Sequence, residues 1–118
     1  MRRILIIDDA ANLRLLYQLE FELEGYEAVA VGSGKEALEI LAHENIDAVI
    51  LDFLLPNSGG LQLLDDLLAR QRHLPIIINT GYAQLRQNFR CWGADAFVVK
   101  SSDLTDLKGA LAQIIATA

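Results

Sequence analysis

The chain has 118 residues, of which 53% are hydrophobic and 22% charged, a composition typical of one folded domain rather than a disordered segment. Its formal net charge of -6 argues against direct nucleic-acid binding, because phosphate contacts need a basic surface. No apolar run is long enough to span a bilayer. The single cysteine, Cys91, cannot form a disulfide within the chain, which is typical of proteins in the reducing cytoplasm. We therefore expect residues 1–118 to form a single cytoplasmic domain that binds neither nucleic acid nor a membrane.

Apolar runs and helical periodicity alternate along the whole chain. They predict strands at about 3–8, 27–31, 47–52, 76–79 and 95–99, and helices at about 11–24, 34–43, 60–71, 83–91 and 103–116. Gly25 is expected to end the first helix, and Ser102 is expected to cap the last one. In the first helix, the residues at the helical spacing expected of an inner face are Leu13, Leu16, Leu19 or Glu20, and Leu23.

Five uninterrupted β/α units predict an α/β fold with one parallel sheet and helices on both faces. Right-handed crossovers make the doubly wound, flavodoxin-like arrangement the natural result, with five strands in the order 2-1-3-4-5 and five helices. In this arrangement the first and third strands are neighbours at a switch point, where ligand sites of such sheets lie.

Four of the apolar runs end on polar residues. These are Asp8 and Asp9 after the first strand, Asp52 after the third, Thr80 after the fourth and Lys100 after the fifth. The carboxyl ends of parallel strands meet at one edge of a sheet, so these side chains are expected to converge there.

Three neighbouring carboxylates repel one another, by about 4 kcal/mol for a pair 4 Å apart at an effective dielectric of 20. Lys100 supplies one compensating charge, and a hard divalent cation, Mg²⁺ or Mn²⁺, would supply the rest. A carboxylate beside such a cation can attack phosphorus and form an acyl phosphate. The Thr80 hydroxyl and the Lys100 ammonium can bind phosphoryl oxygens, so these residues suffice to accept a phosphoryl group.

Over its whole length the chain resembles a response-regulator receiver domain, the phosphoacceptor half of two-component signalling. The residues that carry the resemblance are the acid pair Asp8–Asp9, Asp52 with Pro56 and Gly60 behind it, Thr80 before Gly81, and the segment 93–100 with Phe97 and Lys100. The resemblance implies that Asp8, Asp9 and Asp52 bind the metal, that Asp52 is phosphorylated, and that Thr80 and Phe97 form a switch.

The resemblance also implies partners. A histidine kinase or a phosphotransfer protein would supply the phosphoryl group, and a downstream protein or an output domain missing from this chain would receive the signal. Thr80 would move toward the phosphoryl group and Phe97 would turn inward, altering the face formed by helix 83–91, strand 95–99 and the last helix. The chain would then be a signalling domain rather than an enzyme, apart from catalysing its own phosphorylation and dephosphorylation.

The chain departs from the family pattern at two positions, Ser101 and Leu54. Ser101 replaces the usual proline after Lys100; a cis bond before a non-proline residue costs about 2.5–4 kcal/mol, so we expect a trans Lys100–Ser101 bond, or a cis bond strained by the site. Leu54 is apolar where many relatives are polar, although its backbone carbonyl can still face the metal. We hypothesise that Leu54 and Tyr82 together slow hydrolysis of the acyl phosphate.

Two other functions remain open at this point. A phosphohydrolase could use Asp52 as its nucleophile, but such enzymes usually need a second acid two residues further on, where this chain has Leu54. A degenerate receiver could act only as a scaffold, although the complete set of acids, with Thr80 and Lys100, argues against it.

Overall fold

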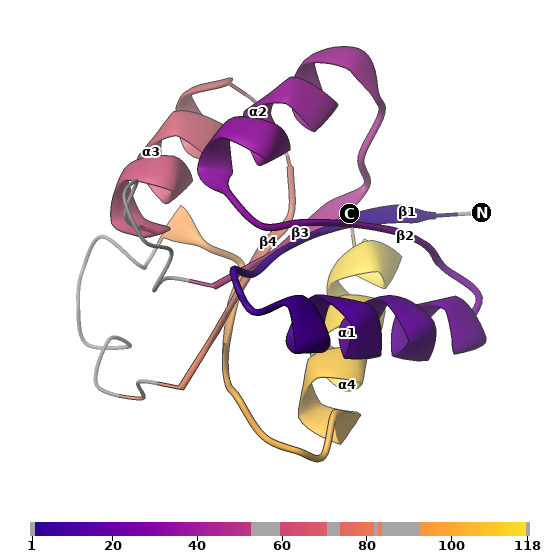
Figure 1. Cartoon of the computed structure of the whole chain (residues 1–118). Helices are drawn as coiled ribbons and strands as arrows, with labels where there is room; N and C mark the ends of the chain where they lie inside the picture. The colour runs from indigo at the N-terminus through magenta and orange to yellow at the C-terminus, as the bar shows by residue number, and fades with distance from the viewer. Residues whose placement is uncertain (1, 53–59, 71–73, 82, 84–92, 118) are drawn as a thin grey trace.

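The computed structural model describes residues 2–52, 60–70, 74–81, 83 and 93–117. These residues form one sheet and the helices that cover it (Figure 1). In chain order the elements are β1 (Arg3–Ile7), α1 (Ala11–Leu23), β2 (Glu27–Val31), α2 (Gly34–His43), β3 (Ala48–Leu51), α3 (Gly60–Arg70), β4 (Ile76–Thr80), β5 (Ala96–Val99) and α4 (Thr105–Thr117).

The sheet is parallel, with the strand order β2-β1-β3-β4-β5, so the predicted doubly wound fold is confirmed. Helices α2 and α3 cover one face and α1 and α4 cover the other, as Figure 1 shows. The fifth predicted helix, at 83–91, lies almost wholly outside the described residues, which therefore contain four helices. None of these four is long and apolar enough to cross a membrane.

The sheet separates two hydrophobic clusters. The apolar odd-numbered residues of β1 and β3 pack with α2 and α3, and the even-numbered ones pack with α1 and α4. Because both faces are covered, every residue of β3 and β4 is buried. This explains why the inner strands read as continuous apolar runs rather than as alternating patterns.

The inner face of α1 differs from the prediction. Tyr17 and Phe21 are the buried residues of this helix, and Leu13 packs against the same cluster. The prediction was wrong for Leu16, Leu19 and Leu23, which are 41%, 54% and 79% exposed. At 3.6 residues per turn, residues 13, 17 and 21 lie on the side opposite the leucines at 15, 16, 19 and 23, so α1 is apolar on two sides. The aromatic side faces the sheet because its rings bury more area than leucines do.

Of the two predicted helix ends, Gly25 is confirmed and Ser102 is wrong. Gly25 adopts a φ of 95°, and the N–H of Tyr26 donates to the carbonyl of Phe21 at 3.1 Å, the pattern of a glycine-terminated helix. The last helix instead begins at Thr105, and Ser102 is not its cap. The Asp103 carboxylate accepts hydrogen bonds from the backbone and hydroxyl of Thr105, at 2.9 and 2.6 Å. A carboxylate suits this place because helix N-termini are electropositive.

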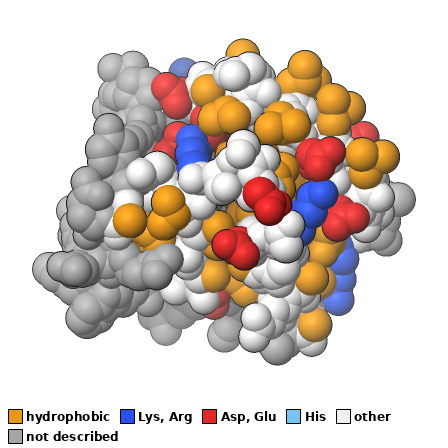
Figure 2. Space-filling view, turned by 90° about the horizontal axis from the view of Figure 1, so that it is seen from below, with side chains coloured by type: hydrophobic (Ala, Val, Ile, Leu, Met, Phe, Trp, Pro, Cys, Tyr) orange, Lys and Arg blue, Asp and Glu red, His pale blue; other side chains and the backbone are white. Residues whose placement is uncertain are grey.

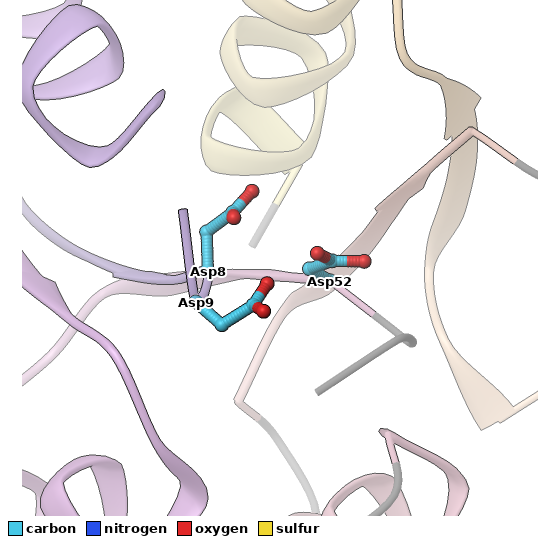
Figure 3. A group of neighbouring side chains, drawn as sticks. All are labelled: Asp8, Asp9 and Asp52. Carbon is cyan, nitrogen blue, oxygen red and sulfur yellow. The ribbon is translucent and has the colours of Figure 1, made fainter. Parts of the chain in front are cut away.

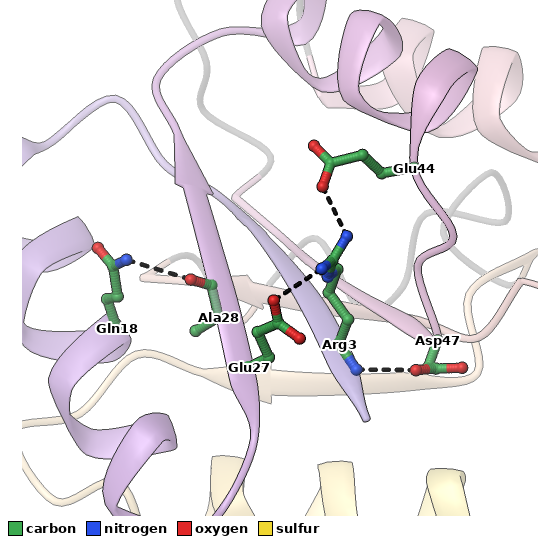
Figure 4. A network of polar contacts seen from close by, with 6 residues as sticks. All are labelled: Arg3, Gln18, Glu27, Ala28, Glu44 and Asp47. Carbon is green, nitrogen blue, oxygen red and sulfur yellow. Dashed lines mark hydrogen bonds and ion pairs between the residues drawn. The ribbon is translucent and has the colours of Figure 1, made fainter. Parts of the chain in front are cut away.

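Figure 4 shows a polar network at the amino end of the sheet, centred on Arg3. The Arg3 backbone N–H donates to Asp47 at 2.7 Å, and its guanidinium contacts Glu44 at 2.6 Å and Glu27 at 2.7 Å. These contacts join the start of β1 to β2, to the end of α2 and to the segment before β3. This edge therefore carries structural links, while the polar strand ends lie at the opposite edge.

Replacing Phe21 by alanine should lower the free energy of unfolding by about 3–5 kcal/mol, because the ring is completely buried. Leu19→Ala should change it by less than about 0.5 kcal/mol, since this side chain is 54% exposed. Urea denaturation followed by circular dichroism measures both values. Equal losses in the two variants would contradict the observed orientation of α1.

Candidate functional site

Asp8 and Asp52 lie side by side because the strands before them are paired. Ile7 and Leu51 are register partners, and the Asp52 N–H donates to the Ile7 carbonyl at 2.9 Å. Asp8 and Asp52 are only 2% and 5% exposed, whereas Asp9 is exposed. Carboxylate oxygens of all three acids lie within 4.8 Å of one another, and Figure 3 shows them at the ends of β1 and β3. The structure thus brings together the three predicted acids.

The Lys100 ammonium lies against two of these carboxylates. Its Nζ is 2.9 Å from Asp8 Oδ2 and 3.0 Å from Asp52 Oδ2. The Lys100 backbone N–H donates to the Thr80 carbonyl at 2.8 Å, which anchors the residue just beyond β5. Burial lowers the pKa of Lys100, but hydrogen bonds to Asp8 and Asp52 and their charges outweigh burial, so the net pKa is raised. Lys100 is therefore a fixed positive charge within the site.

The donor set suits a hard divalent cation. Three carboxylates and one ammonium carry a net charge of −2, and all the side-chain ligands on offer are oxygens. An octahedral Mg²⁺ with bonds of about 2.1 Å spaces its ligand oxygens about 3–4.2 Å apart. The acids already lie within 4.8 Å, so a closure of less than about 2 Å would seat one ion among them.

The other predicted site residues have different outcomes. Thr80 is the last residue of β4 and is completely buried. Phe97 is partly buried, pairs in register with Ile78 and packs against the cluster beneath α2 and α3. Leu54 and Tyr82 lie outside the described residues. No peptide bond within the described residues is cis, so Lys100–Ser101 is trans, as predicted.

Two polar contacts close to the site were not expected from the sequence. Arg14 Nη1 donates to the backbone carbonyl of Asp8 at 2.8 Å. Asn79 Nδ2 donates to the Tyr17 hydroxyl at 3.2 Å, and both side chains belong to residues that are only 2% exposed. The sequence contained one signal for each contact. Arg14 is a cation in the first turn of a helix, where the dipole disfavours it, and Asn79 is an amide at the end of an apolar run.

Comparison with known proteins identifies the family. The family model of the response regulator receiver domain matches residues 4–112. The chain is 31% identical over 111 residues to sporulation initiation phosphotransferase F of Bacillus subtilis, covering 92% of this chain and 90% of that protein. It is 33% identical over 110 residues to regulatory protein AtoC of Escherichia coli, covering 91% of this chain but 24% of that protein. The chain therefore belongs to the response regulator receiver domain family, and it spans only part of some relatives.

Solved structures agree with this assignment. Response regulator TrrA of Thermotoga maritima, in complex with Mg²⁺-BeF, has a TM-score of 0.93 and 36% identity, covering 97% of this chain and 99% of that chain. TrrA in complex with the histidine kinase ThkA gives a TM-score of 0.91 at the same identity, covering 97% and 98% of the two chains. The chain is thus a receiver domain of two-component signalling.

Replacing Tyr17 by phenylalanine should lower the free energy of unfolding at neutral pH by about 1–3 kcal/mol, because the buried Asn79 amide loses its acceptor.

Burial raises the pKa of Tyr17, and this outweighs the hydrogen bond from Asn79 and the charge of Lys100, which lower it. The unfolded chain therefore ionises this phenol from about pH 10 upward while the folded chain keeps it protonated. Stability should thus fall above pH 10, and less steeply in Tyr17→Phe.

Denaturation at a series of pH values between about 7 and 11 checks this expectation. Tyr26→Phe is the matched control, because it removes one hydroxyl from a partly buried ring outside the hydrogen bond to Asn79. Parallel alkaline stability curves for Tyr17→Phe and the unsubstituted chain would contradict the proposed contribution of Tyr17.

Proposed function

We propose that this chain is a phosphoacceptor in a phosphorelay, and that Asp52 receives the phosphoryl group from a phosphohistidine on a histidine kinase or phosphotransfer protein. The observation that carries the proposal is the nearly buried Asp52 carboxylate, 3.0 Å from the Lys100 ammonium and within 4.8 Å of two other acids. The complexes of the relative TrrA with Mg²⁺-BeF and with a histidine kinase support the choice of metal and donor.

The reaction is an exchange of one bond to phosphorus for another. An oxygen of Asp52 attacks the phosphorus, a P–O bond forms, and the P–N bond to the donor imidazole breaks. The electron pair of that bond returns to the imidazole nitrogen, which takes up a proton from water. Lys100, which already contacts Asp52, neutralises charge on the phosphoryl oxygens, and the Thr80 hydroxyl donates to one of them.

The acid pair would hold the cation beside Asp52. Bound Mg²⁺, or Mn²⁺ in its place, would neutralise charge on the transferring group. Asp8 is well suited to this role because its Oδ1 accepts the N–H of Ala10 at 2.9 Å, which fixes the carboxylate. The backbone carbonyl of Leu54, predicted to be a further ligand, lies outside the described residues.

The signal would leave the site through Thr80 and Phe97. We infer that Thr80 moves toward the phosphoryl group and that Phe97 turns inward, altering the face of β5, α4 and the predicted helix 83–91. A downstream protein, or an output domain outside this chain, would read that face. Leu54 and Tyr82 would set how slowly the acyl phosphate is hydrolysed, and the chain would act on no substrate other than its own aspartate.

The outer side of α1 suits the donor protein. Its exposed leucines are Leu15, Leu16, Leu19 and Leu23, at 60, 41, 54 and 79% exposure. Figure 2, which views the molecule from the side of α1 and α4, shows hydrophobic side chains at this surface beside acidic ones. The helix begins two residues after Asp9, so a protein that brings a phosphohistidine to Asp52 comes close to its first turns. Burying a leucine there contributes about 1.5–3 kcal/mol to binding at most.

Incubation with Mg²⁺ and acetyl phosphate should add one phosphoryl group to the chain, detected as a mass increase. Asp52→Asn should abolish the increase because it removes the attacking oxyanion, and chelation of Mg²⁺ should also abolish it. Asp106→Asn is the matched control, since this exposed acid lies in the first turn of α4.

Three results would contradict the phosphoacceptor proposal. A mass increase that persists in Asp52→Asn would place the phosphoryl group elsewhere. Rapid turnover of many phosphate esters without a stable adduct would favour the phosphohydrolase, and complete inertness of the folded chain would favour the scaffold.

Replacing Leu16 and Leu19 together by serine should reduce phosphotransfer from the kinase at low protein concentration by about tenfold or more, because apolar contact area is lost. Phosphorylation by acetyl phosphate should not change, since this small donor needs no docking surface. Single-turnover transfer assays with both donors measure the two rates. A parallel loss with both donors would show damage to the site rather than to docking.

A further inference from the structure

Arg14 makes the nearest unexplained contact to the acid pair. It is the fourth residue of α1 and is partly buried, and its Nη1 lies 2.8 Å from the carbonyl oxygen of Asp8. A cation in the first turn of a helix opposes the helix dipole. The charge-assisted hydrogen bond to the carbonyl offsets this cost and gives the guanidinium a defined position.

The carbonyl that Arg14 holds belongs to the peptide between Asp8 and Asp9. Because a peptide unit is planar, fixing this oxygen also fixes the direction in which Asp9 leaves it. The other side of Asp8 is fixed as well, since its N–H donates to the Val31 carbonyl at 3.1 Å. Asp9 is exposed, so packing contributes little to its placement, and Figure 3 shows it turned toward the other two acids.

Gly32 provides the space that Arg14 occupies. A Cβ atom at this position would lie 2.8 Å from Arg14 Nη1 and 3.3 Å from Arg14 Cζ. The atoms it would meet are the far end of a flexible side chain, so the guanidinium would move while the backbone stayed in place. An alanine at position 32 therefore displaces Arg14 from the Asp8 carbonyl without removing its charge.

We propose that Arg14 is a positioning residue that orients the Asp8–Asp9 peptide for Mg²⁺, and that Gly32 is required to seat its guanidinium. The inference rests on the proposed function, because it assigns the acid pair to the metal. It goes beyond that function by adding two residues, one in α1 and one directly after β2, that would contact neither the metal nor the phosphoryl group.

The test measures Mg²⁺ binding by calorimetry in the unphosphorylated chain. Gly32→Ala and Arg14→Met should each raise the dissociation constant by about tenfold, as is typical when a partner of a metal ligand is lost. The double variant should bind no more weakly than either single one, because both act through one hydrogen bond. Arg14→Lys should bind more tightly than Arg14→Met, since it restores a donor and the charge.

A second measurement separates positioning from loss of folding. Hydrogen exchange of the Ala10 amide, which donates to Asp8 Oδ1, should become faster in Gly32→Ala, while the amide of Val49 in the core should not change. Gly109→Ala is the matched glycine control, because a Cβ there meets nothing within 4 Å. Arg2→Met is the matched arginine control, at the opposite end of β1.

Three results would overturn the inference while leaving the proposed function in place. Unchanged Mg²⁺ affinity in Gly32→Ala and Arg14→Met would remove the positioning role. Tighter binding in Arg14→Met would show that the guanidinium acts only as a repelling charge, and additive losses would show that the two residues act separately. If the unsubstituted chain binds no Mg²⁺, the proposed function itself fails and the inference fails with it.

Discussion

The site depends on the two short ion pairs that Lys100 makes with Asp8 and Asp52. Both carboxylates are almost buried, and a buried charge without a partner is costly. One ammonium serves both, and its backbone is tied to the Thr80 carbonyl on the neighbouring strand. The folded chain therefore tolerates three close acids, yet a charge of −2 remains. That remainder is what makes binding of a divalent cation favourable.

The register of the sheet fixes which side chains can meet at this site. The even-numbered residues of β1 and β3 face α1 and α4, and Asp8 and Asp52 continue that alternation one step past the strand ends. Lys100 does the same two residues beyond Val98, which packs on the same face. If the pairing of β1 with β3 slipped by one residue, the side chain of Asp8 or of Asp52 would lie on the opposite face of the sheet. The apolar runs thus stabilise the fold and also align the charges.

The sequence was most informative where one physical rule decided the outcome. Buried parallel strands must read as apolar runs, so β3 was predicted to within one residue at each end and β4 to within one residue at its carboxyl end. The high cost of a cis bond before Ser101 left a trans bond or a strained cis bond as the two expected outcomes, and the structure has the trans bond. The orientation of α1 was predicted wrongly because the helix is apolar on two sides, and periodicity does not distinguish them. Arg14 was missed because its partner is a backbone carbonyl, which no side-chain pattern identifies; the one signal was a cation in the first turn of a helix.

Helix α1 connects the site with the surface, because its inner side contacts the site and its outer side faces solvent. Its inner side reaches the site twice: Arg14 contacts the Asp8 carbonyl, and Tyr17 holds Asn79, the residue before Thr80. Its outer side presents leucines to solvent. A helix moves as a rigid unit. A protein bound to the outer side of α1 would therefore contact the same helix that contacts Asp8 and the end of β4. A phosphodonor that docks on the outer side, as proposed above, would therefore be linked through one helix to the Asp8 carbonyl and to the residue before Thr80.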